Sequence, residues 1–305
     1  MNTRDDALIF AVADANLLGI VSCPELASDC GVLIIVGGPQ HRVGSHRQFL
    51  LLAWRLASAG YPVLRFDVRG MGDSDGTACS FDEVSADIGA AIDAFQKACP
   101  TLRHVMLWGL CDAASAALLY LQSTGDKRVA GLALLNPWVR SEASLAQMHI
   151  KHYYARRLMQ RGFWIKLLSG KMQVLRSVRG FLQNAAAARR RQSPAQEGAR
   201  QSFQDRMADG LRRFSGSVLL ILSGEDYTAR EFLEYVGSNA AWAGLIDASD
   251  KLIRVDLANA DHTFSSAALR ASVESATLNW LERWSLDSSR SFSCTSRAYC
   301  SSKSN

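Results

Sequence analysis

The sequence predicts an α/β fold: a mostly parallel, doubly wound sheet that carries a helical cap insertion. Two observations support this. Short apolar runs typical of buried strands alternate with segments of helical periodicity along the 305 residues. The alternation stops near residue 138 and resumes near 215, and the segment between is basic, helical in pattern and without a convincing strand. We therefore expect one sheet interrupted by a cap.

The first two apolar runs, within residues 6–22, surround a short polar turn and predict an antiparallel hairpin. Further strands are expected at 31–36, 61–66, 105–108, 129–135, 217–222 and 251–255. Helices are expected at 46–59, 82–97, 113–121 and 267–284. Strands linked through helices of this length favour parallel pairing with right-handed crossovers.

These elements divide the chain into four parts. Residues 1–137 and 215–286 are expected to form the two halves of the core, and residues 138–214 the basic helical cap. The tail, 287–305, is rich in serine and poor in aliphatic residues, so we expect it to be disordered.

The composition, 48% hydrophobic and 21% charged, is typical of a soluble globular protein. No apolar run approaches the roughly 20 residues that cross a bilayer, and the acidic N-terminus is unlike a signal peptide. Seven cysteines without CxxC pairs or metal-ligand spacing fit a reducing compartment. We therefore expect a cytoplasmic protein that needs no cofactor, holds no metal and does not bind nucleic acid.

Charge is distributed unevenly along the chain. Residues 138–214 contain 16 Lys and Arg against 4 Asp and Glu, a net charge of +12, whereas the remainder carries −7. Such a basic segment favours an anionic partner through long-range attraction. A membrane surface, contacted through arginines and aromatic side chains, and a merely solvated helical face are the alternatives.

A reactive side chain is expected between His104 and Ser115. A buried apolar strand, 105–108, is followed by an abrupt turn and a helix of small residues, with Cys111 at the apex. A nucleophile elbow needs small residues two positions before and after the nucleophile, and Gly109 and Ala113 meet this requirement. The alternative is a buried structural cysteine.

A nucleophilic cysteine needs a base, and the base needs an orienting acid. In enzymes with such an elbow the acid and the histidine follow the nucleophile, each after a later strand. Asp226 follows the strand at 217–222, and His262 follows the strand at 251–255. Glu225 and Asp261 are alternatives for the acid. His41 and His46 lie near the Gly37-Gly38 loop but do not have the chain position expected of the base. His149 and His152 lie in the basic segment, where we expect contact with substrate or solvent instead.

An acyl-transfer site also needs donors for the developing oxyanion. The N–H of Asp112, next to the nucleophile, is one candidate. Gly38 is the second, with Gln40 as an alternative, because Pro39 has no N–H. We also consider Gln40, His41, His152 and Tyr153 as substrate-binding residues.

The sequence resembles the α/β-hydrolase superfamily over residues 6–285, and more closely the exosortase A system-associated hydrolase 1 family. The segments that carry this resemblance are GGPQHRVGSHRQF (37–49), RFDVRGMGDSDG (65–76), LWGLCDAASAALLY (107–120), LNPWVRSEAS (135–144), KHYYARRL (151–158), LSGEDYTAREF (222–232) and ADHTFS (260–265). Membership would imply a role beside exopolysaccharide biosynthesis and the sorting of proteins with a PEP-type C-terminal signal. The superfamily usually has serine where this chain has Cys111.

The sequence thus predicts an acyl-transfer enzyme, either an esterase or thioesterase or an acyltransferase. Cys111 would attack the carbonyl of an ester or thioester. His262 would transfer the proton, and Asp226 would hold the imidazole in its orientation. The basic cap would recruit an anionic donor, such as an acyl carrier protein with a phosphopantetheine arm or a CoA thioester. The alternative is a non-catalytic binding module for an acyl carrier or for the biosynthetic machinery. No sequence feature predicts the oligomeric state.

Overall fold

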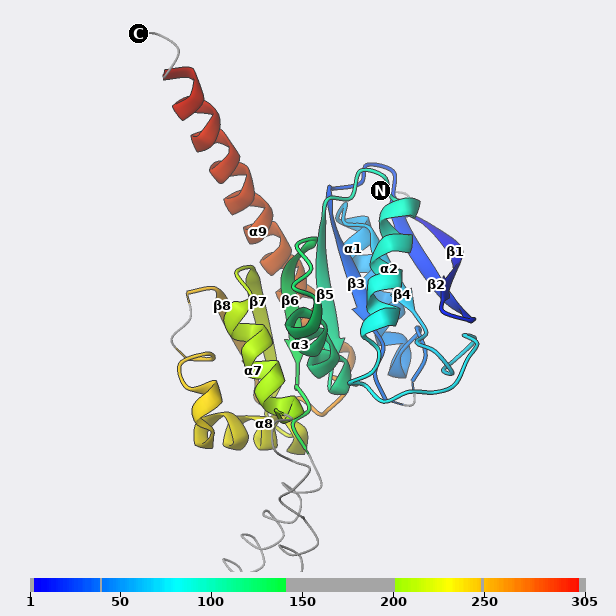
Figure 1. Cartoon of the computed structure of the whole chain (residues 1–305), viewed down its shortest axis with the longest axis vertical. Helices are drawn as coiled ribbons and strands as arrows, with labels where there is room; N and C mark the ends of the chain where they lie inside the picture. The colour runs from blue at the N-terminus through cyan, green and yellow to red at the C-terminus, as the bar shows by residue number, and fades with distance from the viewer. Residues whose placement is uncertain (1–2, 39, 141–200, 248–249, 302–305) are drawn as a thin grey trace, which may run out of the picture. The chain divides into compact units, whose positions relative to one another are not determined.

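The computed structural model describes residues 3–38, 40–140, 201–247 and 250–301. Its sheet has eight strands in the order β1-β2-β4-β3-β5-β6-β7-β8 (Figure 1). The strands are β1 (Thr3–Val12), β2 (Ala15–Pro24), β3 (Cys30–Ile35), β4 (Val63–Phe66), β5 (His104–Leu110), β6 (Val129–Leu135), β7 (Ser217–Ser223) and β8 (Leu252–Leu257). The β1–β2 hairpin is antiparallel and β2 pairs antiparallel with β4, whereas all other pairs are parallel. The predicted doubly wound sheet is confirmed.

Helices cover both faces of the sheet, as Figure 1 shows. They are α1 (Gln48–Ser58), α2 (Ser85–Ala98), α3 (Asp112–Thr124), α7 (Phe203–Arg213), α8 (Tyr227–Ser238) and α9 (Ala267–Ser301), with short 3-10 turns η1 (Ser45–Arg47) and η2 (Ala240–Trp242). One core cluster joins the sheet to α2, α3, α7 and α8, and a second joins it to α1 and α9. Because both faces are covered, the middle strands are apolar on both sides.

The C-terminal boundary expected for the cap differs from the structure. The segment from Phe203 onward belongs to the same compact unit as the sheet, and α7 packs on α3. Met207 and Ala208 are fully buried, and a Cβ at Gly210 would lie 2.4 Å from the carbonyl oxygen of Leu118. The charged face of α7 made it resemble the basic insertion, while its narrow apolar face covers the core. Residues 141–200, the rest of the expected cap, lie outside the described residues.

Helix α9 continues to Ser301, within the tail of 287–305, and the expected disorder of this tail stays a prediction. The composition of the segment agrees with a continuous helix. Between 267 and 301 the sequence contains neither glycine nor proline, so no residue interrupts the helix after its last apolar contacts with the core.

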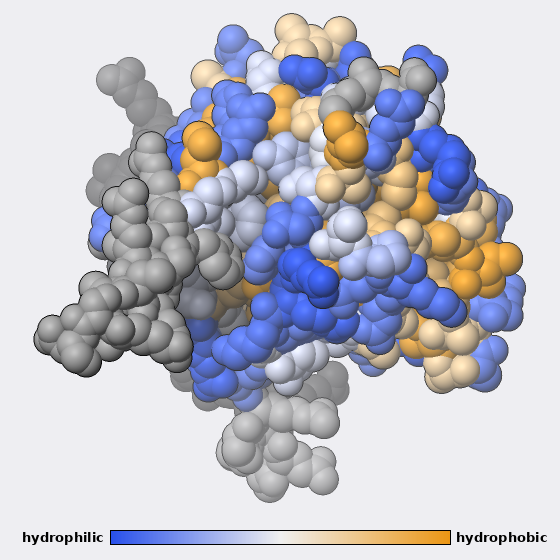
Figure 2. Space-filling model, turned by 90° about the horizontal axis from the view of Figure 1, so that it is seen from above, coloured by the Kyte–Doolittle hydropathy of each residue, from blue (hydrophilic) through white to orange (hydrophobic). Residues whose placement is uncertain are grey.

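The surface has both hydrophilic and apolar regions. Seen from above, hydrophilic residues cover the middle of the molecule, and apolar residues gather toward the right of the view, the side on which β1 lies (Figure 2). Ile9 of the edge strand β1 is 75% exposed. In the part of the chain that the structure describes, no helix combines the length and the apolar character needed to span a bilayer.

Candidate active site

Cys111 occupies the sharp turn between β5 and α3. Its backbone has φ 62° and ψ −123°, a conformation that residues with a side chain rarely adopt. Two hydrogen bonds stabilise it: the N–H of Cys111 donates to the carbonyl of Leu135 at 2.8 Å, and the N–H of Trp138 donates to the carbonyl of Cys111 at 3.2 Å. Strain of this kind, held in place by neighbouring structure, is common at functional sites.

The small residues around Cys111 are required by close backbone contacts. A Cβ at Gly109 would lie 2.6 Å from the carbonyl carbon of Ala113 and 2.7 Å from the nitrogen of Ala114. The strand, turn and helix expected around Cys111 are therefore present, and the turn has the tightness that a nucleophile elbow needs.

Asp226 and His262 meet at the carboxyl end of the sheet. The Nδ1 of His262 lies 2.8 Å from the Oδ2 of Asp226. The carboxylate of Asp226 also caps α8, because it accepts the N–H groups of Thr228 at 3.1 Å and Ala229 at 3.3 Å. Helix α8 was not among the helices expected from the sequence, although an acidic N-cap residue before an amphipathic segment is a signal for it.

Neither alternative acid occupies this position. Glu225 is exposed, whereas Asp226 is only 5% exposed. The carboxylate of Asp261 bonds within its own loop, to the backbone N–H and the hydroxyl of Ser265. Asp226 is thus the carboxylate that contacts the imidazole.

The contacts of His262 change its protonation. The hydrogen bond to Asp226, followed by that to Cys111, raises the pKa of His262 to about 10. Burial alone would raise the pKa of Asp226, but the hydrogen bond from His262 and the N–H groups at the start of α8 hold it below its usual value. These contacts favour the protonated form of the imidazole next to the sulfur of Cys111.

Asn136 connects the loops that carry these residues. It is fully buried, directly follows β6 and has φ 43°. Its side-chain amide donates to the hydroxyl of Ser223 at 2.8 Å and to the carbonyl of His262 at 3.3 Å, and it accepts the N–H of Ser223 at 2.9 Å. Asn136 was not among the residues predicted for the site, because an Asn-Pro pair after a strand is typical of a simple turn.

The two residues predicted to donate to the oxyanion do meet, but through the side chain of one of them. The N–H of Gly38 donates to the Oδ2 of Asp112 at 2.8 Å. A Cβ at Gly37 would lie 2.0 Å from the Oδ1 of Asp112, so the carboxylate lies against the Gly37-Gly38 backbone. Burial raises the pKa of the Asp112 carboxyl, and the N–H groups of Gly38 and Ala113 partly offset this rise. In this structure the N–H of Gly38 is bonded to a carboxylate.

The structure describes two of the four residues that were predicted to bind substrate. Gln40 is half-buried, and its side-chain oxygen accepts the N–H of Ser45 at 3.3 Å. His41 is exposed, and its Nδ1 accepts the N–H of Val43 at 3.4 Å. His152 and Tyr153 lie outside the described residues. Substrate binding by these four residues stays a prediction.

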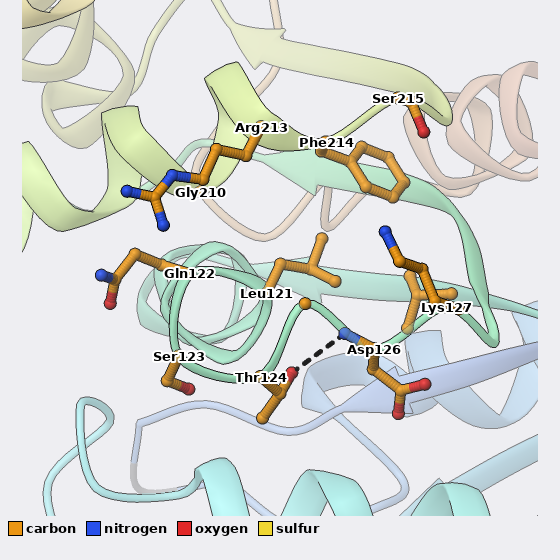
Figure 3. Close-up of a pocket in the computed structure, with 12 residues that line it drawn as sticks. Leu121, Gln122, Ser123, Thr124, Asp126, Lys127, Gly210, Arg213, Phe214 and Ser215 are labelled. Carbon is orange, nitrogen blue, oxygen red and sulfur yellow. Dashed lines mark hydrogen bonds between the residues drawn. The ribbon is translucent and has the colours of Figure 1, made fainter.

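A separate hollow of about 420 Å³ lies between the C-terminal ends of α3 and α7 (Figure 3). Thr124, Lys127 and Arg213 are among its lining residues. It is situated at the edge where the parallel strands begin, opposite the edge that carries Cys111 and His262. It is therefore distinct from the candidate active site. Within the described residues, no group of three or more His, Cys, Asp or Glu side chains is arranged to hold a metal ion.

An eight-stranded, mostly parallel sheet with a strained elbow residue after β5 and a histidine after β8 defines an α/β hydrolase. Residues 29–226 match the family described as serine aminopeptidase, S33, and the chain belongs to this family of hydrolases. The family takes its name from serine, whereas the elbow residue here is Cys111.

Solved structures share the fold over most of the chain. An esterase from Pyrococcus furiosus is 16% identical, with a TM-score of 0.59 and coverage of 93% of both chains. A dienelactone hydrolase from Anabaena variabilis is 14% identical, with a TM-score of 0.57 and coverage of 93% of this chain and 99% of the other. An α/β serine hydrolase without lid from Xanthomonas campestris is 14% identical, with a TM-score of 0.54 and coverage of 93% and 96%. No curated protein sequence matches the chain significantly.

Proposed function

We propose that the protein is an acyl-transfer enzyme that acts on esters or thioesters through a covalent acyl-cysteine on Cys111. One observation carries this proposal: the sulfur of Cys111, on a strained turn, faces an imidazole whose other nitrogen is bonded to the buried carboxylate of Asp226. This arrangement of nucleophile, base and orienting acid is what covalent acyl transfer requires. The esterase and dienelactone hydrolase of the same fold agree with this class of reaction.

In the first half of the reaction, protonated His262 acts as the acid. The thiolate of Cys111 attacks the acyl carbonyl, and the carbon–sulfur bond forms as the carbonyl oxygen becomes negative. When the tetrahedral intermediate collapses, the bond to the leaving group breaks, and His262 gives its proton to the departing alkoxide or thiolate. The products are acyl-Cys111, the free alcohol or thiol, and a neutral imidazole.

The second half restores the enzyme. Neutral His262 removes a proton from water or from an acceptor hydroxyl, whose oxygen then attacks the acyl-cysteine. The acyl group leaves with this oxygen, and the thiolate and imidazolium are regenerated. Asp226 stabilises the imidazolium and keeps Nδ1 turned away from the sulfur.

The donor that we propose is an anionic acyl carrier, either a carrier protein with a phosphopantetheine arm or a CoA thioester. The net charge of +12 over residues 138–214 supports this choice. The motifs at 135–144 and 151–158 support a role beside exopolysaccharide biosynthesis and the exosortase system. Carrier binding should weaken as salt is raised, because charge attraction is screened. Affinity that is independent of salt would contradict an electrostatic role of this segment.

Intact-protein mass spectrometry tests the central step. The protein is exposed briefly to a panel of acyl thioesters and activated esters, alongside Cys111→Ala and His262→Ala. We expect a transient acyl adduct on the wild-type protein, no adduct at this position in Cys111→Ala, and slow formation in His262→Ala. If no donor acylates the folded wild-type protein, the proposal is wrong.

A non-catalytic binding module is the second candidate, favoured by the Asp112 carboxylate at the N–H of Gly38. It predicts that an acyl carrier binds wild type and Cys111→Ala equally well and that neither protein turns over a thioester. Turnover that depends on Cys111 would exclude it.

A further inference from the structure

The carboxylate of Asp112 lies where the reaction needs a hydrogen-bond donor. Asp112 directly follows the nucleophile, and its Oδ2 accepts the N–H of Gly38 at 2.8 Å. Its Oδ1 lies so close to Gly37 that any side chain at that position would collide with it. The loop after β3 and the start of α3, 74 residues apart in sequence, thus hold one carboxylate between them.

A substrate carbonyl and this carboxylate compete for the same donor. During attack by Cys111 the acyl oxygen becomes an anion, and an N–H group aimed at it lowers the barrier. While Gly38 is bonded to Asp112, that N–H is not available to the substrate. Two negative oxygens at one donor also repel each other, so the carboxylate has to move before the intermediate forms.

Displacing Asp112 has a cost that depends on the acyl group. A half-buried carboxylate that loses its donor is left with an unmet hydrogen bond, which is unfavourable. A hydroxyl on the acyl chain near the carbonyl would offer a replacement donor. A plain alkyl chain offers none, so the carboxylate discriminates between the two.

We propose that Asp112 is a specificity-determining residue that favours acyl groups bearing a hydroxyl next to or one carbon beyond the scissile carbonyl. This inference rests on the proposed acyl transfer through Cys111. Hydroxylated substrates exchange one hydrogen bond of Asp112 for another as their carbonyl takes over the N–H of Gly38. Unsubstituted acyl groups react slowly because they leave the carboxylate of Asp112 without a hydrogen-bond donor.

The test compares matched thioesters: 2-hydroxybutyryl and 3-hydroxybutyryl donors against the 2-methyl and 3-methyl butyryl donors of similar shape. The rate of acylation of Cys111 is followed by mass spectrometry in wild type, Asp112→Ala and Asp112→Asn. Asn retains an oxygen that can accept the N–H of Gly38 but carries no charge, which guards against a folding defect in the alanine variant. Glu225→Gln serves as control, because it removes an exposed negative charge next to Asp226 and leaves Asp112 in place.

We expect wild type to prefer a hydroxylated donor by about 10-fold or more. In Asp112→Ala this ratio should fall toward one, mainly because the methyl donors react faster, and Asp112→Asn should lie between. Glu225→Gln should keep the wild-type ratio. An unchanged ratio in both Asp112 variants, or slower acylation by all donors, would overturn the inference while leaving acyl transfer intact. If no donor acylates Cys111 in any folded protein, the proposed function itself fails.

Discussion

The Nδ1 of His262 lies 2.8 Å from the Oδ2 of Asp226, and this contact leaves only the Nε2 of the imidazole for Cys111. Since Asp226 is buried and also caps α8, its carboxylate is held in place independently of the histidine. The acid is therefore preorganised, and the ring adopts the one orientation that serves both neighbours.

This pair predicts how stability depends on pH. The pKa of His262 is raised to about 10, so its contribution is fully present below its unfolded pKa of about 6.5 and is lost as pH rises toward 10. The pKa of Asp226 is lowered, so its contribution is present above about pH 4 and is lost as pH falls. We expect the melting temperatures of wild type and Asp226→Asn to differ most near pH 5–7 and to converge at both extremes. A difference that is constant from pH 3 to 10.5 would show that the pair does not titrate in this way.

Replacing Cys111, the proposed nucleophile, by serine should make the reaction rate strongly dependent on pH. A hydroxyl becomes nucleophilic only if a neutral imidazole removes its proton. Because the hydrogen bond to Asp226 raises the pKa of His262, we expect Cys111→Ser to react about 100-fold or more slowly than wild type at pH 7. Its rate should rise as the pH is raised. The measurement is the pH–rate profile for an activated ester, and a serine variant as fast as wild type at pH 7 would contradict the protonated state of His262.

Asn136 should support catalysis as well as stability. Asn136→Ala removes three hydrogen bonds and places alanine at positive φ, so we expect destabilisation of about 2–4 kcal/mol. Asn136→Gly is the matched control, because glycine tolerates this backbone conformation and isolates the loss of the side chain. In both variants kcat should fall while KM changes little, since the carbonyl of His262 loses its anchor. Unchanged kcat in variants that are clearly destabilised would restrict Asn136 to a structural role.

Among the five cysteines described, and leaving aside the proposed nucleophile Cys111, Cys23 should be the most reactive thiol. Its sulfur lies 3.3 Å from that of Cys99, and this hydrogen bond lowers the pKa of Cys23 to about 7. Burial, by contrast, raises the pKa of Cys30. We expect iodoacetamide at pH 7.5 to alkylate Cys23 well before Cys30, as peptide mapping would show.

The control for this labelling is Cys99→Ala, in which loss of the hydrogen bond from Cys99 should slow the alkylation of Cys23. Equal rates in the two proteins would show that Cys99 does not activate Cys23. The result also matters for acylation experiments, since adducts on Cys23 have to be distinguished from those on Cys111.

The local patterns of the chain were sufficient for the class of fold and for the candidates at the site. Alternating apolar strands and helices predict the parallel sheet, and Gly109 and Ala113 predict the tight turn at Cys111, because these signals depend on neighbours in sequence. The order of Cys111, Asp226 and His262 along the chain is the one expected of α/β hydrolases, and parallel topology places the loops that carry them at the same edge of the sheet. Their catalytic roles stay predictions until the adduct is measured.

Other features depend on contacts that no local pattern encodes. The place of α7 in the core follows from a small apolar face that meets α3. The side-chain amide of Asn136 forms a hydrogen bond with Ser223, which lies 87 residues later in the sequence. The carboxylate of Asp112 accepts the N–H of Gly38, which lies 74 residues earlier. The sequence by itself determined the class of fold and the candidate residues of the site. Only the tertiary structure decided which groups they contact, because strand order brings distant loops within hydrogen-bonding range.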